Sequence, residues 1–391
     1  MWRAFRKPAA LKRLFVPVSC EQPADSTEER PFEIGLRQYQ ANRLIEDRFS
    51  FKMLRPSKSS PNRQKWFAAS VFDGHGGWQV AEYVSHRLHK HFEEALENID
   101  VADAEDVRMI KDSYRVIPGS PDAEVTRPED KHAILALQQA YDNCDSAIQD
   151  QIFPAAVDFK FSRVARVGSC AISVLVGDES LVVANAGDCQ AVLVRGEEGL
   201  LLNTIHNANE PLEQERMKKY RPHEDGIVCK KSPHYENGLS CRVKGMLQPT
   251  RSFGDFHLKS EKLVWDHEHG RPFLPHPAAD FPYITAHPDV SVVSRCSDDK
   301  WLVLASDGLW DYVSPAEVAQ FSAKCKSSQE LADLLTDTVL TKTAERVGVT
   351  VADLKALPPG RNRRSLHDDV TVLVLKLDED ATENNDTKSI R

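Results

Sequence analysis

The sequence predicts an α+β fold in one large domain. Strand-like and helix-like segments are grouped along the chain rather than strictly alternating, which is typical of layered α+β proteins. Apolar residues make up 41% of the 391 residues, enough for a sizeable core at this length. Short acidic turns recur beside apolar runs from residue 46 to residue 369, so one kind of feature spans almost the whole chain. We therefore expect a single domain over residues 32–377.

The spacing of apolar residues predicts the elements of this domain in order. Val80, Val84 and Leu88 recur at helical spacing and predict a helix after Gly77. Residues 101–130 are acidic and contain several prolines, so we expect a mobile insertion there. The other expected elements are a helix over 131–152, strands joined by turns over 168–195, a short helix over 213–220, a long loop over 259–282, helices over 315–322 and 329–346, and a final strand over 370–377.

The two ends of the chain differ in composition from the domain. Residues 1–20 are basic, carry interleaved apolar side chains and have no acid before Glu21, which resembles a mitochondrial transit peptide. A basic disordered tail is the alternative, because Pro8 weakens a continuous helix. We expect residues 21–31 to be a linker and residues 378–391 to be a polar, disordered tail. The predicted location is the mitochondrial matrix, with the cytoplasm as the alternative.

Composition argues against several classes of protein. The net charge of −9 disfavours nucleic acid as the main partner, because phosphate backbones favour basic surfaces. No apolar run approaches the ~20 residues of a transmembrane helix, so we expect no integral membrane segment. None of the eight cysteines forms a C-x-x-C pair, which argues against a zinc site. Free thiols suit a reducing compartment.

Carboxylates beside strand-like runs are the most informative feature of the chain. A carboxylate at a strand end is held rigidly, and several brought together make an all-oxygen site that suits hard cations such as Mg²⁺ or Mn²⁺. One Asp-Gly turn is weak evidence, because such turns are common in hairpins. Here Asp73-Gly74 and Asp307-Gly308 each follow a long apolar run. The acids of these turns are Glu46, Asp47, Asp73, Asp188, Asp307, Asp368 and Asp369.

In their order and number, these motifs resemble those of the type 2C metal-dependent protein serine/threonine phosphatases. The resemblance covers roughly Phe32 to Leu377. Residues 40–42, 45–48, 206–210 and 242–245 are similar to the branch that contains the mitochondrial pyruvate dehydrogenase phosphatases and their plant relatives. The resemblance implies two antiparallel β-sheets sandwiched between pairs of α-helices, with metals in a cleft at one edge. It also implies hydrolysis of phosphoserine and phosphothreonine in a protein substrate by attack of a metal-bridging hydroxide.

The resemblance assigns metal-binding roles position by position. It implies that Asp73 bridges two Mg²⁺ or Mn²⁺ ions and that Gly74 offers a backbone carbonyl, directly or through water. Asp307 and Asp368 would complete the shell of the first ion. Glu46 would bind the second ion, mostly through waters.

Further roles are implied for four other positions. Asp47 would orient nearby water or bind a metal through it, and Asp188 would share a third ion with Asp307. His75 is the candidate general acid, since protonating a serine or threonine alkoxide typically gives ~10²–10⁴-fold. Asp369 points the opposite way from Asp368 on a strand, and either acid could be the ligand. The register of the motif favours Asp368.

An arginine is missing from the place where the wider family grips the substrate phosphate. That position, four residues before Glu46, is Asn42 here, and Arg43 follows it. Either Asn42 hydrogen-bonds the phosphate weakly, or Arg43 bends in through a bulge, or another basic residue substitutes. Arg251 lies in a family motif near the cleft, but a structural salt bridge is the favoured interpretation of that residue.

The leading functional hypothesis is an active protein phosphatase, and its branch suggests a mitochondrial dehydrogenase complex as substrate. The single Cys-x5-Arg match, Cys189 to Arg195, lies in an apolar strand-like run and has no glycine-rich phosphate loop, and there is no Gly-x-Ser-x-Gly elbow. A two-metal site, in contrast, can supply both hydroxide and charge neutralisation. A catalytically inactive scaffold and a phosphatase for small phosphorylated metabolites are the alternatives. A scaffold should have lost metal-binding acids, which this chain retains. The sequence leaves the oligomeric state open.

Overall fold

The computed structural model describes residues 31–55, 64–99, 114–117, 127–222, 224, 227–228, 241–274 and 281–378. Two large β-sheets form its centre. One sheet has the strand order β1-β14-β13-β7-β8, with every pair antiparallel. Its strands are β1 (Glu33–Tyr39), β7 (Gln190–Arg195), β8 (Glu198–Leu201), β13 (Asp299–Ala305) and β14 (Val370–Lys376).

The other sheet has the order β2-β3-β5-β6-β12-β4, and β9 pairs with β5. Its pairs are antiparallel except β12 with β4, which is parallel. The strands are β2 (Arg48–Met53), β3 (Phe67–His75), β4 (Tyr114–Val116), β5 (Gly168–Val176), β6 (Ser180–Ala186), β9 (Phe253–Gly254) and β12 (Asp289–Ser294).

The main core lies between the two sheets. Val71 and Ile172 of one sheet share a buried cluster with Leu193, Leu304 and Leu373 of the other. The central strands read as continuous apolar runs because both of their faces are covered, and every residue of β5 is buried. This packing holds the strand ends in fixed positions, where the acidic turns begin.

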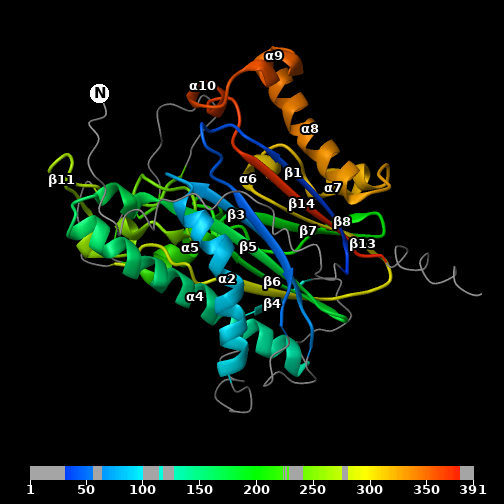
Figure 1. Ribbon diagram of the computed structural model, residues 1–391, viewed down its shortest axis with the longest axis horizontal. Helices are drawn as coiled ribbons and strands as arrows, with labels where there is room; N and C mark the ends of the chain where they lie inside the picture. The colour runs from blue at the N-terminus through cyan, green and yellow to red at the C-terminus, as the bar shows by residue number, and fades with distance from the viewer. Residues whose placement is uncertain are drawn as a thin grey trace, which may run out of the picture.

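Helices cover the outer face of each sheet, so the layers run helix, sheet, sheet, helix (Figure 1). On the β3–β5 side lie α2 (Gln79–Asn98) and α4 (Pro128–Val157). On the β13–β14 side lie α7 (Pro315–Ser322) and α8 (Ser328–Val347). The predicted α+β fold with two antiparallel sheets between helices is confirmed, apart from the parallel pairing of the short β4.

Shorter elements connect these layers. They are α5 (Pro211–Tyr220), α6 (Asp307–Trp310), α9 (Val351–Ala356) and α10 (Arg361–Arg364), with the 3-10 turns η2 (Ser162–Arg166), η3 (Phe256–Leu258) and η4 (Glu261–Leu263) and the hairpin β10 (Trp265–Asp266) and β11 (Arg271–Pro272). Residues 259–282, expected to be a loop, thus contain η4 and this hairpin. Strands of two residues are too short to leave a period-2 pattern.

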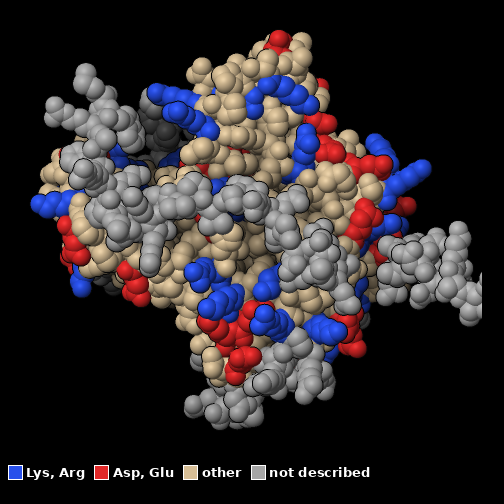
Figure 2. Space-filling view, in the orientation of Figure 1, with Lys and Arg blue, Asp and Glu red and all other residues tan. Residues whose placement is uncertain are grey.

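Some expectations fall partly or wholly outside the described residues. The expected transit peptide at 1–20 does so entirely, as does nearly all of the expected 378–391 tail. Within the expected insertion at 101–130, β4 is described and extends the sheet beside β12. Among the described residues, no helix is both long and apolar enough to cross a membrane. Figure 2 shows Lys and Arg interspersed with Asp and Glu on one face.

Candidate metal centre

Three aspartates from separate strand ends meet at one edge of the sandwich. Asp73 lies near the end of β3, Asp188 in the turn between β6 and β7, and Asp307 at the start of α6 directly after β13. One carboxylate oxygen of each lies within 4.8 Å of the others. The backbone N–H of Asp307 donates to Asp73 Oδ2 at 3.4 Å. Residues more than 200 positions apart in the sequence are therefore brought into one site.

The charges of this cluster are not balanced by the protein around it. Burial and then the neighbouring carboxylates, Asp307 first among them, raise the pKa of Asp73 well above its usual value. The pKa of Asp307 is raised in the same way by burial and then by Asp188. Asp307 Oδ1 is buried and has no hydrogen-bond partner. An oxygen-only donor set with an orphaned carboxylate oxygen fits Mg²⁺ or Mn²⁺.

Gly74 allows a close approach of two segments beside Asp73. A Cβ at Gly74 would lie 2.3 Å from the carbonyl oxygen of Glu46, which no side chain could tolerate. The strand end of β3 therefore lies directly against the loop that carries Glu46 and Asp47. This contact brings the Glu46-Asp47 pair to the aspartate cluster.

Glu46 and Asp47 differ in their surroundings. Glu46 is half-buried, and burial followed by repulsion from Asp369 raises its pKa to about 7. Asp47 is buried, and its Oδ2 accepts hydrogen bonds from Ser306 Oγ and Thr371 Oγ1, both at 2.8 Å. Ser306, directly after β13, and Thr371 of β14 thus hold one carboxylate oxygen of Asp47. The Glu46 carboxylate remains a candidate metal ligand.

The hydrogen bonds of Asp369 distinguish its role from that of Asp368. Asp369 is buried and accepts from the backbone N–H groups of Ala41, Asn42 and Glu46 at 2.6, 3.0 and 2.8 Å. Its carboxylate therefore organises the 41–46 loop. Asp368 lines the cleft beside Asp307, and burial is the main cause that raises its pKa to about 6. This arrangement supports Asp368 as the ligand.

The two candidates for phosphate binding in the 41–46 loop differ in their surroundings. The side-chain Nδ2 of Asn42 donates to Asp369 Oδ2 at 3.0 Å. Arg43 is exposed. Their proposed contacts with phosphate remain predictions, and the structure places a different arginine, Arg364, in the cleft. Arg364 stands in a basic run, 361–364, which in sequence looks like an ordinary solvated turn.

His75 forms a dyad that the sequence did not reveal. His75 Nε2 lies 2.6 Å from Asp255 Oδ2, and Ser252 Oγ donates to that same oxygen at 2.7 Å. Burial lowers the pKa of His75, but the charge of Asp255 outweighs it and the net shift is upward. The only signal in the sequence is the Thr250–Asp255 stretch, which carries Asp255 close to Arg251. The two partners are 180 residues apart, so spacing could not pair them.

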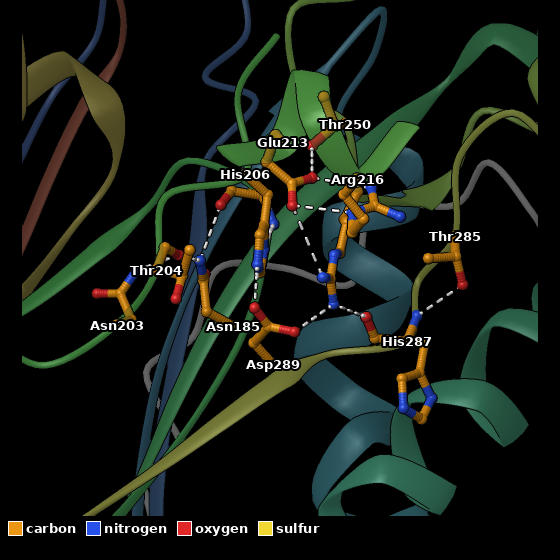
Figure 3. A network of polar contacts seen from close by, with 12 residues as sticks. Asn185, Asn203, Thr204, His206, Glu213, Arg216, Thr250, Thr285, His287 and Asp289 are labelled. Carbon is orange, nitrogen blue, oxygen red and sulfur yellow. Dashed lines mark hydrogen bonds and ion pairs between the residues drawn. The ribbon is translucent and has the colours of Figure 1, made fainter. Parts of the chain in front are cut away.

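A second polar network supports the turn that carries Asp188. Gly187 N–H donates to His206 Nδ1 at 3.3 Å, and His206 N–H donates to the Gly187 carbonyl at 2.9 Å. Asn207 Nδ2 donates to Asp188 Oδ2 at 2.9 Å. On its other side, His206 Nε2 lies 3.0 Å from Asp289 Oδ2 (Figure 3). Through these contacts, the 206–210 motif holds the turn that carries Asp188.

Arg251 belongs to this supporting network. Its Nη1 lies 2.7 Å from Asp289 Oδ1 and donates to the carbonyl of His287 at 3.0 Å. The side chain is only 8% exposed. The favoured interpretation of Arg251 as a structural salt bridge matches these contacts.

A cleft of about 410 Å³ opens beside the aspartates. Its walls come from the Asp188 turn, α6 and the segment that joins α10 to β14. The residues that matter most for its chemistry are Asp188, Asp307, Trp310, Arg346, Arg364 and Asp368. The cleft is therefore where a phosphorylated side chain could reach the metal-binding acids.

A sandwich of antiparallel sheets that gathers carboxylates at one edge is the arrangement of a metal-dependent phosphatase. The chain belongs to the protein phosphatase 2C family. The model of this family, described as Protein phosphatase 2C, matches residues 40–348. The family consists of protein serine/threonine phosphatases that depend on Mg²⁺ or Mn²⁺. This assignment confirms the resemblance to type 2C phosphatases and the predicted class of enzyme and cofactor.

Among curated proteins, the chain is similar to plant relatives. It is 29% identical to Probable protein phosphatase 2C 38 of Arabidopsis thaliana over 90% of this chain and 83% of that protein. It is 29% identical to Probable protein phosphatase 2C 8 of Oryza sativa subsp. japonica, over 79% of this chain but only 62% of that longer protein.

A solved structure described as a C. elegans sex determining protein shares the fold. The two align with a TM-score of 0.54 and 18% identity, over 89% of this chain and 65% of that one. At this identity the similarity concerns the fold alone.

Proposed function

We propose that this chain hydrolyses phosphoserine and phosphothreonine in a protein substrate at the aspartate cluster, with Asp73 and Asp307 as its central metal ligands. The observation that carries the proposal is the convergence of Asp73, Asp188 and Asp307 within 4.8 Å, with Asp307 Oδ1 buried and unpartnered. Membership of the protein phosphatase 2C family supports it.

The residues around the cluster have distinct tasks in this proposal. Asp73, Asp307 and Asp368 would hold one ion, and Glu46 with the Gly74 carbonyl would serve the second. When bound, the ions make hydroxide available at neutral pH and neutralise phosphoryl oxygens. Asp47, held by Ser306 and Thr371, would accept a hydrogen bond from water at the site through its remaining oxygen.

His75 would donate the proton to the departing serine or threonine oxygen. Asp255 favours the protonated imidazole and orients it through Nε2. The Nδ1 proton of the imidazolium is then the one left for the leaving group. A general acid of this kind typically contributes ~10²–10⁴-fold.

The finer proposal is that the substrate is a subunit of a mitochondrial dehydrogenase complex. It rests on the resemblance of residues 40–42, 45–48, 206–210 and 242–245 to the pyruvate dehydrogenase phosphatase branch and on the basic, acid-poor residues 1–20. Imaging of a tagged full-length chain in cells tests it. A chain found only in the cytosol would remove the mitochondrial target and leave the phosphatase proposal standing.

The test of the proposed activity is metal-dependent turnover of a small aryl phosphate and of phosphopeptides. We expect turnover with Mn²⁺ or Mg²⁺, none in excess chelator, and none for Asp73→Asn. A folded, metal-loaded protein without turnover would favour the scaffold alternative. A strong preference for phosphorylated metabolites over phosphopeptides would favour the metabolite alternative.

A further inference from the structure

Arg364 presents a guanidinium to the acidic cleft from an unexpected part of the chain. It is the last residue of α10 and contacts Asp368 Oδ2. Its side chain is 46% exposed and lines the same cleft as Asp188, Asp307 and Asp368. The guanidinium therefore lies beside the proposed metal ligands and open to a ligand in the cleft.

Neighbouring contacts fix α10 in this position. Arg363 is buried, and its Nη1 donates to the carbonyl of Gln40 at 2.9 Å. Its guanidinium lies over the ring of Tyr39 at 5.1 Å. At the start of the turn, Gly360 N–H donates to the carbonyl of Ala41 at 2.8 Å. The backbone of Arg364 is thus anchored to residues 39–41.

That anchor is directly beside the position where the family's phosphate-binding arginine is missing. Asn42 follows the anchored residues, and its amide is bonded to Asp369. Arg43 is exposed. The fold therefore places an arginine of α10 next to the position, Asn42, where the family's arginine is missing.

The other basic groups of the cleft, Arg346 and His367, make contacts away from the aspartate cluster through one nitrogen each, and His367 Nε2 is buried without a hydrogen-bond partner. Arg346 Nη2 donates to Tyr312 Oη at 2.8 Å and also contacts the carbonyl of Leu366. His367 is buried, and Nδ1 lies 2.7 Å from the carbonyl oxygen of Asp368. A guanidinium is not deprotonated in proteins, so Arg364 is a permanent cation in the cleft.

We propose that Arg364 binds the phosphoryl group of the substrate at the metal centre, in place of an arginine at position 42. A guanidinium has five N–H donors, so it can keep one contact with Asp368 and direct another pair to phosphate oxygens. The inference rests on the proposed function, because it takes the acidic cluster to hold the metal ions.

The test measures binding of inorganic phosphate to the Mn²⁺-loaded protein by titration calorimetry, without turnover. Arg364→Ala should weaken phosphate binding roughly tenfold to a hundredfold, the usual worth of hydrogen bonds to a charged group. Arg364→Lys keeps the charge but loses the planar fork, so it should fall between. Arg361→Ala is the matched control, an exposed arginine on the same turn, and should bind phosphate like the wild type.

A Mn²⁺ titration of the same variants separates phosphate binding from a role in orienting Asp368. We expect Arg364→Ala to bind Mn²⁺ as well as the wild type or more tightly, because a competing cation has been removed. Weaker Mn²⁺ binding with unchanged phosphate affinity at saturating Mn²⁺ would overturn the proposal. So would a wild-type protein that binds Mn²⁺ but not phosphate.

Failure of the proposed function would look different. The wild type would then show no Mn²⁺-dependent turnover of aryl phosphate, whatever the phosphate affinities of the variants.

Discussion

Two clusters of acids lie on either side of the Gly187-Asp188 turn, and they have opposite electrostatics. In the network behind the turn, Asp289 is paired with His206 and Arg251. Burial opposes it, but the His206 hydrogen bond and Arg251 hold the pKa of Asp289 below its usual value. In the cluster in front, Asp73 and Asp307 face mainly other carboxylates, and their pKa values are raised.

The difference separates a structural role from a binding role. An acid that the protein pairs with its own cations has its charge compensated within the fold, and removal of one partner is destabilising because the other charge is left unpaired. Buried acids that the protein leaves unbalanced cost stability and persist only where a function needs them. The front cluster therefore requires external cations, whereas the rear network does not.

The largest effect should come from removing a front-cluster acid. Asp307→Asn should lower turnover of an aryl phosphate by at least about a thousandfold, a modest share of typical enzymatic acceleration. The same change should raise the stability of the metal-free protein, because one repelling charge is gone. Urea denaturation in chelator measures the second effect. Lower stability together with lost activity would indicate simple misfolding instead.

Breaking the rear network should have the opposite pattern. Arg251→Met leaves Asp289 without its arginine, and we expect a loss of about 1–3 kcal/mol in the free energy of unfolding. The expected loss of stability is smaller than for a fully buried ion pair, because the Asp289 side chain is 43% exposed. Denaturation curves measure it in the presence and absence of Mn²⁺. A neutral effect would mean that the two clusters do not differ as described.

The pH dependence of stability should distinguish the two clusters further. Glu46 and Asp368 have folded pKa values raised to about 7 and about 6, so the metal-free folded state binds more protons than the unfolded chain. The contribution of these two carboxyls to the free energy of unfolding is fully present below their pKa values in the unfolded chain. It is lost as pH rises through their pKa values in the folded state. The Tm of the metal-free protein should therefore fall between about pH 5 and about pH 8, and Mn²⁺ should reverse the trend. A metal-free Tm that rises across this range would contradict the assignment.

A smaller effect is expected at the vacant arginine position. Asn42→Arg would add a charge-assisted fork beside the cleft and should tighten inhibition by phosphate by up to about tenfold. The gain is limited because the amide bond to Asp369 is lost. Arg43→Ala should change little, since Arg43 is exposed. If Arg43→Ala abolished phosphate inhibition and Asn42→Arg did nothing, Arg43 would be the phosphate ligand.

The smallest effect should follow deletion of residues 1–20. A transit peptide is not part of the folded domain, so kcat and KM should stay unchanged. The truncated chain should move from mitochondria to the cytosol in cells. Unchanged localisation with unchanged kinetics would remove the targeting hypothesis.

Local patterns predicted the α+β class and a carboxylate site at strand ends, whereas the two-sheet arrangement and the pairing of Asp188 with Asp307 were implied by the resemblance to type 2C phosphatases. Asp73 directly follows an apolar run, and Asp188 and Asp307 are each separated from one by a single residue, so their positions at a sheet edge follow from the strands. Helices α2 and α8 were likewise visible as periodic segments, although α4 extends beyond its predicted ends.

What the sequence did not reveal depends on long-range contacts. Asp255 and His75 are joined only by folding, and the role of Asp369 appears only once its carboxylate meets the 41–46 loop. The position of Arg364 in the cleft could not be predicted, because the placement of its basic turn depends on the contact of the buried Arg363 with Gln40. The three residues of β4 are too few for a periodic signal.

The most direct test of the central claim is a calorimetric Mn²⁺ titration of the wild type and Asp307→Asn in buffers of different ionisation enthalpy. The account predicts saturable binding by the wild type with release of protons near neutral pH, because the raised pKa values leave carboxyls protonated without metal. It predicts that Asp307→Asn, still folded by circular dichroism, loses most of that binding. Tight Mn²⁺ binding that survives Asp307→Asn, or a folded wild type that binds no Mn²⁺, would contradict it.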